Sequence, residues 1–300
     1  MTTSPIMQCK GPRAPAQRDA PCPGGGGERS ARARARGGEQ RGTAVAGQRQ
    51  ALTSQQGPAP STMPRDNMAS LIQRVAQQAR ITFRGPAPGP GFGENLHRLQ
   101  QLLNEVRAED LHLAPRGPAA VPGAGCSRAG AGAGAVPPVS YMHICETESF
   151  SMGVFLLRSG ACIPLHDHPG MNGMLKVLYG SLRIACLDPL PPAAPPGARR
   201  RALLRSRQLY TPASPPCLLS PHTDNLHQID AVDGPAAFLD ILAPPYDPEH
   251  GRDCHYYRLL EAPAAADPHA LPREVWLLET PQAPDFWCGG EPYPGPKVSP

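Results

Sequence analysis

No run of eighteen apolar residues occurs in this 300-residue sequence, and no apolar segment stands at its start. The sequence therefore predicts neither a membrane-spanning helix nor a secretory signal peptide. It also lacks a glycine-rich dinucleotide-binding fingerprint, which argues against an NAD-dependent enzyme. The nine cysteines are an odd number and include no C-x-x-C pair, so no disulfide framework is indicated. We expect a reduced, cytoplasmic protein with no membrane partner.

Excess positive charge is confined to residues 1–62, which contain nine Lys or Arg and three acidic residues. The rest of the chain sums to about −2, so no nucleic-acid partner is expected. Residues 1–62 are rich in Arg, Gly and Pro, which predicts a disordered extension. The Gly and Pro content argues against an amphipathic mitochondrial transit peptide. Met63 stands just before the first ordered pattern, and we hypothesise that the native protein begins there.

Two helices and a linker are expected in residues 63–138. The first helix would begin near Asp66 or Asn67, either of which can act as its N-cap. A second helix is predicted over 94–108, with a leucine stripe that we interpret as core packing. The stretch 114–138 is rich in Ala, Gly and Pro and predicts a loose linker. Apolar residues recur at helical spacing in both helices, at Met68, Leu71, Ile72, Val75 and Ala79, and at Leu96, Leu99, Leu102, Leu103 and Val106.

Residues 139–300 show the pattern of a β domain. About eight short apolar runs, from VSYMHICE at 139 to REVWLLET at 273, are separated by turn signals such as Ser159-Gly160 and Asp233-Gly234. Strands with no helices between them predict an antiparallel sandwich or barrel. The segment 188–207 is predicted as an insertion loop, since Pro and Arg dominate it.

Two histidines one residue apart are the strongest chemical signal. In a strand, His166 and His168 project to the same face while Asp167 turns away. Two imidazoles on one rigid face can occupy adjacent positions on a metal ion. The alternative is a pair of surface histidines on a loop, which the neighbouring Pro164 and Pro169 make plausible.

A third imidazole would complete such a site. The candidates in the later strands are His222, His227 and His255. His227 begins the alternating stretch HQIDAV and is our first choice, with His222 second. Three imidazoles leave one side of a metal ion open, which suits Fe(II) for dioxygen chemistry and Zn(II) for water activation. The ligands alone do not choose between these two metals. Five other histidines have no partner at ligand spacing: His97, His112, His143, His250 and His269.

The order of these residues resembles the cupin family. The first cupin motif, G-x5-H-x-H-x3–4-E-x6-G, is matched by Gly160, His166, His168 and Gly180, but Gly173 occupies the position of the metal-binding glutamate. The second motif is matched more loosely, with His227 in place and Asp224 where glycine is usual. Thiol dioxygenases are the cupin branch that lacks this glutamate and keeps three histidines on Fe(II).

Longer blocks resemble the cysteamine dioxygenase family of thiol dioxygenases. They include IPLHDHPGM, DNLHQIDAV, GPAAFLDILAPPYDP and GRDCHYYR, and the resemblance covers residues 63–300 except the linkers. It implies a mainly β double-stranded β-helix, the jelly-roll barrel of cupins, with N-terminal helices before a catalytic domain at 139–300. It also implies one Fe(II) per chain, held by His166, His168 and His227, with O2 as co-substrate.

The same resemblance implies two substrates. Cysteamine would be converted to hypotaurine, and the N-terminal cysteine of proteins to the sulfinate, an oxygen-dependent N-degron signal. Both substrates contain a 2-aminoethanethiol unit, so one site would serve both. The open-faced site favours a monomer.

Four further residues are candidates for the site. Asp240 on a strand would pair with the substrate ammonium, and Tyr246 just after it would form a hydrogen bond near sulfur or dioxygen. Cys254 and Tyr256 are i and i+2 on one strand and resemble the cysteine–tyrosine thioether pair of thiol dioxygenases. The alternative functions are a Zn or Mn cupin isomerase or hydrolase, and a non-enzymatic ligand-binding cupin.

Overall fold

The computed structural model describes residues 69–85, 89–117, 136–191, 195, 197–260 and 270–300. The predicted disordered extension, the start at Met63 and the caps Asp66 and Asn67 lie outside these residues, as does most of the predicted linker at 114–138. No helix in the described ranges is long and apolar enough to cross a membrane.

Both predicted helices are present. Helix α1 spans Leu71–Thr82 and is capped by Ser70, whose hydroxyl accepts a hydrogen bond from the Gln73 backbone N–H. Helix α2 spans Phe92–Glu105, and a short 3-10 turn, η3, follows at Ala108–Leu111. The leucine stripe of α2 packs into the core, as predicted, through Leu99 and Leu103.

Ten strands in the described residues join into one sheet in the order β10-β1-β2-β7-β3-β8-β9-β5-β4-β6. They are β1 (Val139–Glu146), β2 (Ser151–Leu157), β3 (Cys162–Asp167), β4 (Asn172–Pro189), β5 (Arg199–Tyr210), β6 (Cys217–Leu219), β7 (Leu226–Ala243), β8 (Tyr256–Leu260), β9 (Arg273–Thr280) and β10 (Cys288–Gly290).

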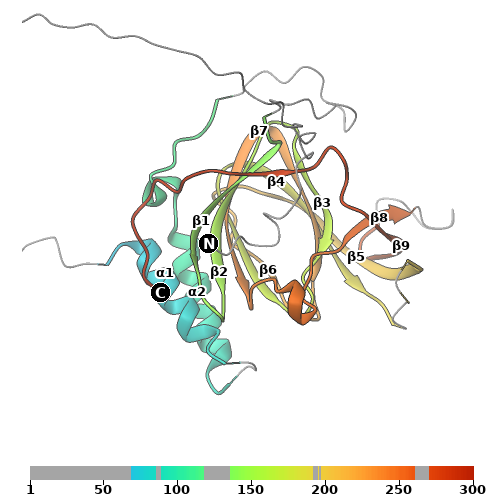
Figure 1. Cartoon of the computed structure of the whole chain (residues 1–300), viewed down its shortest axis with the longest axis horizontal. Coiled ribbons are helices and arrows are strands. Elements are labelled where there is room, and N and C mark those ends of the chain that lie inside the picture. Colours follow the sequence, from blue (N-terminus) through green and yellow to red (C-terminus); the bar gives the residue numbers. More distant parts are fainter. Residues whose placement is uncertain (1–68, 86–88, 118–135, 192–194, 196, 261–269) are drawn as a thin grey trace, which may run out of the picture. The chain divides into compact units, whose positions relative to one another are not determined.

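The long strands β4 and β7 pair with each other along almost their whole length. Pairings β7–β3, β3–β8, β8–β9, β9–β5 and β5–β4 then close a six-strand antiparallel barrel. The predicted mainly β jelly-roll barrel with N-terminal helices is thereby confirmed. Figure 1 shows both helices beside β1 and β2, on the opposite side of the molecule from β8 and β9.

Three apolar clusters hold these layers. One packs α1 and α2 against the outer faces of β1, β2 and β7. Val298, near the end of the sequence, also packs against this cluster. There, the Gln73 side chain donates to the Ser299 carbonyl at 2.7 Å and accepts from its N–H at 2.8 Å. A second cluster fills the barrel and includes Phe155 and Phe238. The third lies between β5, β9 and their neighbours.

Two expectations about the strands were wrong. The predicted insertion loop at 188–207 contains most of β5, which pairs with β4 and β9. Its arginines hid the alternation that buries Ala202 and Leu204, and Arg201 is held outside by an ion pair with Glu274 at 2.7 Å. The turn predicted at Asp233-Gly234 is a bend within the single strand β7, where both residues adopt positive φ.

Candidate metal centre

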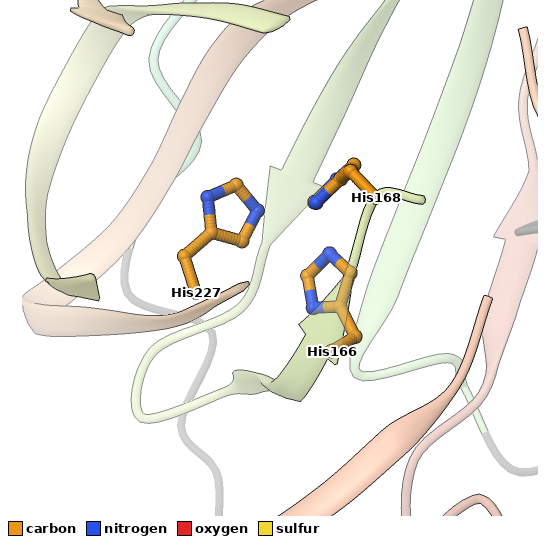
Figure 2. A group of neighbouring side chains, drawn as sticks. All are labelled: His166, His168 and His227. Carbon is orange, nitrogen blue, oxygen red and sulfur yellow. The ribbon is translucent and has the colours of Figure 1, made fainter. Parts of the chain in front are cut away.

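Two neighbouring strands bring the three predicted ligands together. His166 lies in β3, His168 directly follows that strand, and His227 is the second residue of β7. His166 and His227 are direct partners in the antiparallel β3–β7 pair, so their side chains stand side by side on one face. Figure 2 shows the three rings turned toward one another.

The three imidazoles form one compact, buried group. Their ring centroids lie 4.7 to 4.8 Å apart. One ring nitrogen from each residue lies within 4.8 Å of the others, so small side-chain rotations would bring all three onto one ion. Each residue is at most 4% exposed. No other such group of His, Cys, Asp or Glu occurs in the described part of the chain.

Backbone carbonyls set the orientation of two of the rings. The Nδ1–H of His166 donates to the Pro164 carbonyl at 2.8 Å, and that of His168 donates to the Asn225 carbonyl at 3.1 Å. These bonds leave the Nε2 lone pairs for a metal. Burial lowers the pKa of His166, His168 and His227, which keeps all three imidazoles neutral, as metal ligands must be.

The three histidines line a narrow pocket with a cavity volume of about 10 Å³. Its walls are apolar apart from Asp240, the acid predicted to face the substrate. This carboxyl makes no hydrogen bond with the described residues, and burial raises its pKa to about 7. The remaining walls are Phe155, Ile163, Ile229 and Phe238. The pocket therefore combines a neutral metal site with one titratable acid.

The other predicted residues lie around this pocket. The Tyr246 ring packs 5.6 Å from that of His168, and its hydroxyl donates to the Asp167 carbonyl at 2.7 Å. Tyr256 is paired with His166 across β3 and β8, with ring centroids 6.3 Å apart. Cys254 precedes β8 instead of lying in it. Burial, with a smaller contribution from the Cys254 thiol, raises the pKa of Tyr246.

Sequence reasoning missed Asn225. Its buried amide accepts from the His168 backbone N–H at 3.3 Å and donates to the His168 carbonyl at 2.7 Å. The sequence carries no local signal for this contact, because it joins two segments 57 residues apart. The second-choice ligand, His222, is exposed and lies outside the group.

Gly173 explains why a fourth protein ligand is missing. Like the buried Leu175, it belongs to the inward-facing set of β4. A Cβ atom added there would lie 2.7 Å from Cγ of Leu219. Leu219 is buried, so it fills the space that a glutamate side chain would need.

The sequence is similar to a known family and to named proteins of that family. Residues 102–298 match the family model PCO_ADO. The chain is 62% identical over 267 residues to "2-aminoethanethiol dioxygenase" of Mus musculus, covering 79% of this chain and 100% of the relative. It is 58% identical over 279 residues to the Homo sapiens protein of the same name, with the same coverage. "Plant cysteine oxidase 1" of Arabidopsis thaliana is 30% identical over 250 residues, covering 78% and 82%.

Solved structures also include similar chains. KdgF from Halomonas sp. is 15% identical and covers 37% of this chain and 84% of its own, with a TM-score of 0.29. A cupin superfamily protein from Desulfitobacterium hafniense is 13% identical and covers 35% and 76%, with a TM-score of 0.26.

Replacing any one of His166, His168 or His227 with Ala should abolish stoichiometric binding of a divalent metal, because two imidazoles hold an ion far more weakly than three. The measurement is Co(II) titration of the metal-free chain, followed by its visible absorption. His222→Ala is the control and should still bind one ion per chain. Full binding by the three site variants would rule out this centre.

Gly173→Glu should destabilise the fold by about 2 kcal/mol, because the new side chain overpacks the barrel against Leu219. It should not tighten metal binding. Urea unfolding and Co(II) titration test both statements. Adding Leu219→Ala should recover part of the lost stability, and a stable Gly173→Glu chain with tighter metal binding would contradict this interpretation.

Asp240→Asn should stabilise the metal-free chain at pH 8 by about 1 kcal/mol. The gain is small because the carboxyl faces the pocket. A raised native pKa means that the unfolded chain loses its proton first, so ionisation costs stability as pH rises toward 7. The difference should shrink toward zero near pH 3, below the ordinary pKa of 3.8, where both states are largely protonated. Urea unfolding at the two pH values measures it, with the exposed Asp285→Asn as control; equal stabilisation at both would refute it.

Proposed function

This chain belongs to the PCO_ADO family of thiol dioxygenases, and from that premise we propose that it is an Fe(II) enzyme acting on 2-aminoethanethiol units. Its substrates would be cysteamine, converted to hypotaurine, and the N-terminal cysteine of proteins, converted to the sulfinate. The single observation that carries this proposal is the buried group of three neutral histidines beside a pocket with one acid.

The donor set fits a single metal ion. His166, His168 and His227 would hold it by neutral nitrogens, with no protein carboxylate in the group. When bound there, Fe(II) would supply an open face for the substrate thiolate and dioxygen, and would help to deliver electrons to the oxygen. The two carbonyl hydrogen bonds to Nδ1 would keep His166 and His168 oriented throughout turnover.

Asp240 gives the pocket its selectivity for an amine. A 2-aminoethanethiol unit whose sulfur reaches the histidines would place its amino group two carbon atoms from that sulfur, in a pocket where Asp240 is the acid. The ionised carboxylate would bind the ammonium, and the ammonium would in turn favour ionisation of Asp240. The apolar walls, such as Phe155 and Phe238, would exclude water around the reacting sulfur.

The names of the relatives support both substrate classes. Three are named for 2-aminoethanethiol, which is cysteamine, and two for plant cysteine oxidation. Since cysteamine and an N-terminal cysteine share the same amine-and-thiol unit, one pocket would accept either. We further propose a cytoplasmic monomer whose action on proteins produces an oxygen-dependent N-degron.

The test is dioxygen consumption by chain loaded anaerobically with Fe(II), supplied with cysteamine or with a peptide that begins in cysteine. We expect uptake with both and a peptide mass gain of two oxygen atoms. Asp240→Asn should raise the KM for cysteamine roughly tenfold, since a charge-assisted contact is lost. His168→Ala should be inactive. No uptake with either thiol, despite bound iron, would refute the proposal.

A further inference from the structure

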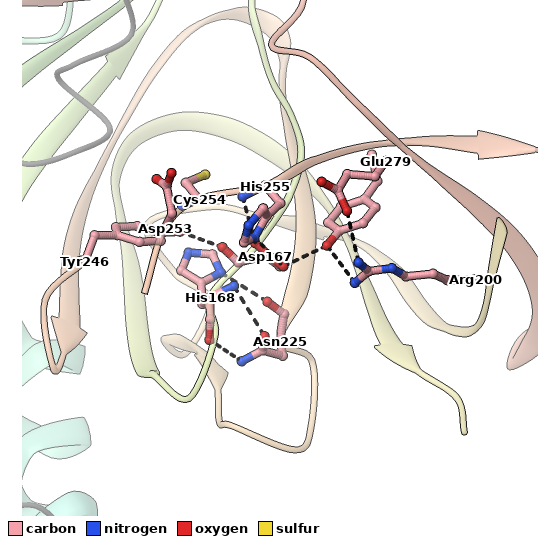
Figure 3. Close-up of polar contacts among 10 residues, drawn as sticks. Asp167, His168, Arg200, Asn225, Tyr246, Asp253, Cys254, His255 and Glu279 are labelled. Atoms are coloured by element: carbon pink, nitrogen blue, oxygen red, sulfur yellow. Dashed lines mark hydrogen bonds and ion pairs between the residues drawn. The ribbon is translucent and has the colours of Figure 1, made fainter. Parts of the chain in front are cut away.

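Asp167 lies between two predicted metal ligands but points away from the pocket. Its carboxylate lies on the β8 side of β3, where it accepts hydrogen bonds from three donor groups (Figure 3). The donors are the His255 backbone N–H at 2.8 Å, the His255 Nδ1–H at 3.2 Å and the Tyr257 hydroxyl at 2.8 Å. Both carboxylate oxygens are occupied, because Oδ1 accepts the backbone N–H and Oδ2 accepts the hydroxyl.

The backbone of Asp167 is held by the same part of the chain. Its N–H donates to the His255 carbonyl at 3.1 Å, and its carbonyl accepts from the Tyr246 hydroxyl at 2.7 Å. All these partners lie between Tyr246 and Tyr257, in the connection from β7 to β8 and the start of β8. That connection also carries Cys254.

A second set of contacts fixes the Tyr257 end of this network. Arg200 of β5 donates to the Tyr257 hydroxyl at 3.2 Å, and its guanidinium lies 5.4 Å from the ring centroid. Arg200 also forms an ion pair with Glu279 of β9 at 2.9 Å. Residues of three barrel strands, β5, β8 and β9, therefore hold the Tyr257 hydroxyl where it donates to Asp167.

We propose that Asp167 is a positioning residue that fixes the 244–257 connection against the metal-binding turn. The route to the metal is short, because the carboxylate holds His255 and Tyr257 at one end of this connection. At its other end, the Tyr246 ring packs on His168. Asp167 thus sets the place of the His168 ring without binding the metal itself. The role in turnover rests on the proposed function, whereas the structural role does not.

Asp167→Asn isolates this role because it preserves size. An asparagine has one acceptor oxygen and one NH2 donor where the carboxylate has two acceptors. It can serve the His255 N–H or the Tyr257 hydroxyl as an acceptor, but not both. Asp188→Asn is the matched control, since both aspartate side chains are 13% exposed and both accept a side-chain and a backbone hydrogen bond.

The first readout is amide hydrogen exchange of the metal-free chain. Peptides covering 244–257 should exchange at least fivefold faster in Asp167→Asn than in the natural sequence, and at the unchanged rate in Asp188→Asn. The second readout is the visible spectrum of Co(II)-loaded chain. Asp167→Asn should still bind one Co(II) but with shifted ligand-field bands, because the His168 ring is less constrained.

Turnover supplies the third readout. We expect Asp167→Asn to lower kcat for cysteamine about tenfold, equivalent to about 1.4 kcal/mol in the barrier, with KM changed less than twofold. Exchange rates and a Co(II) spectrum identical to those of the natural sequence would overturn the assignment. So would complete loss of Co(II) from a folded variant, since Asp167 would then be needed to hold the ligands themselves.

Two controls keep the outcome decisive. If Asp167→Asn does not fold, Tyr257→Phe removes one donor and should produce a smaller change in the same direction; unchanged exchange at 244–257 in that variant would overturn the assignment. If the natural sequence oxidises no thiol, the proposed function fails, and the exchange rates and Co(II) spectrum still decide the role of Asp167.

Discussion

The pairing of β3 with β7 is the constraint on which the rest of the site depends. It places His166 opposite His227, although 60 residues separate them in the sequence, and the turn after β3 adds His168. The long β4–β7 pair then closes the barrel around them. A shift of one residue in the β3–β7 register would turn His227 to the outer face and dismantle the centre.

Burial gives the three imidazoles their chemical state. A charged imidazolium in this interior would be costly, so all three stay neutral and ready to bind a cation. The same burial keeps Asp240 partly protonated near neutral pH. A nearby metal ion or substrate ammonium would each favour ionisation of Asp240. Metal loading and substrate binding would therefore both change the charge of the pocket.

The sequence predicted that His166 and His168 share a face, because strand alternation is a local rule. The choice of His227 over His222 as their partner agrees with the grouping of the three imidazoles in the structure. Asn225 and the partners of Asp167 could not be read in this way, since their contacts cross between strands. The arginines of β5 misled for a different reason, because their ion pairs with Glu274 and Glu279 form only after β9 is in place.

The contact between α1 and the end of the sheet domain has a consequence for synthesis. Gln73 meets Ser299 through two hydrogen bonds across a sequence separation of 226 residues. Arg80 likewise donates to the Pro300 carbonyl at 2.8 Å. The helix that leaves the ribosome first among the described elements therefore cannot complete its packing until residues near 300 emerge. Its apolar face can pack on α2 early in translation, whereas its polar side gains these last partners only after the whole barrel has been made.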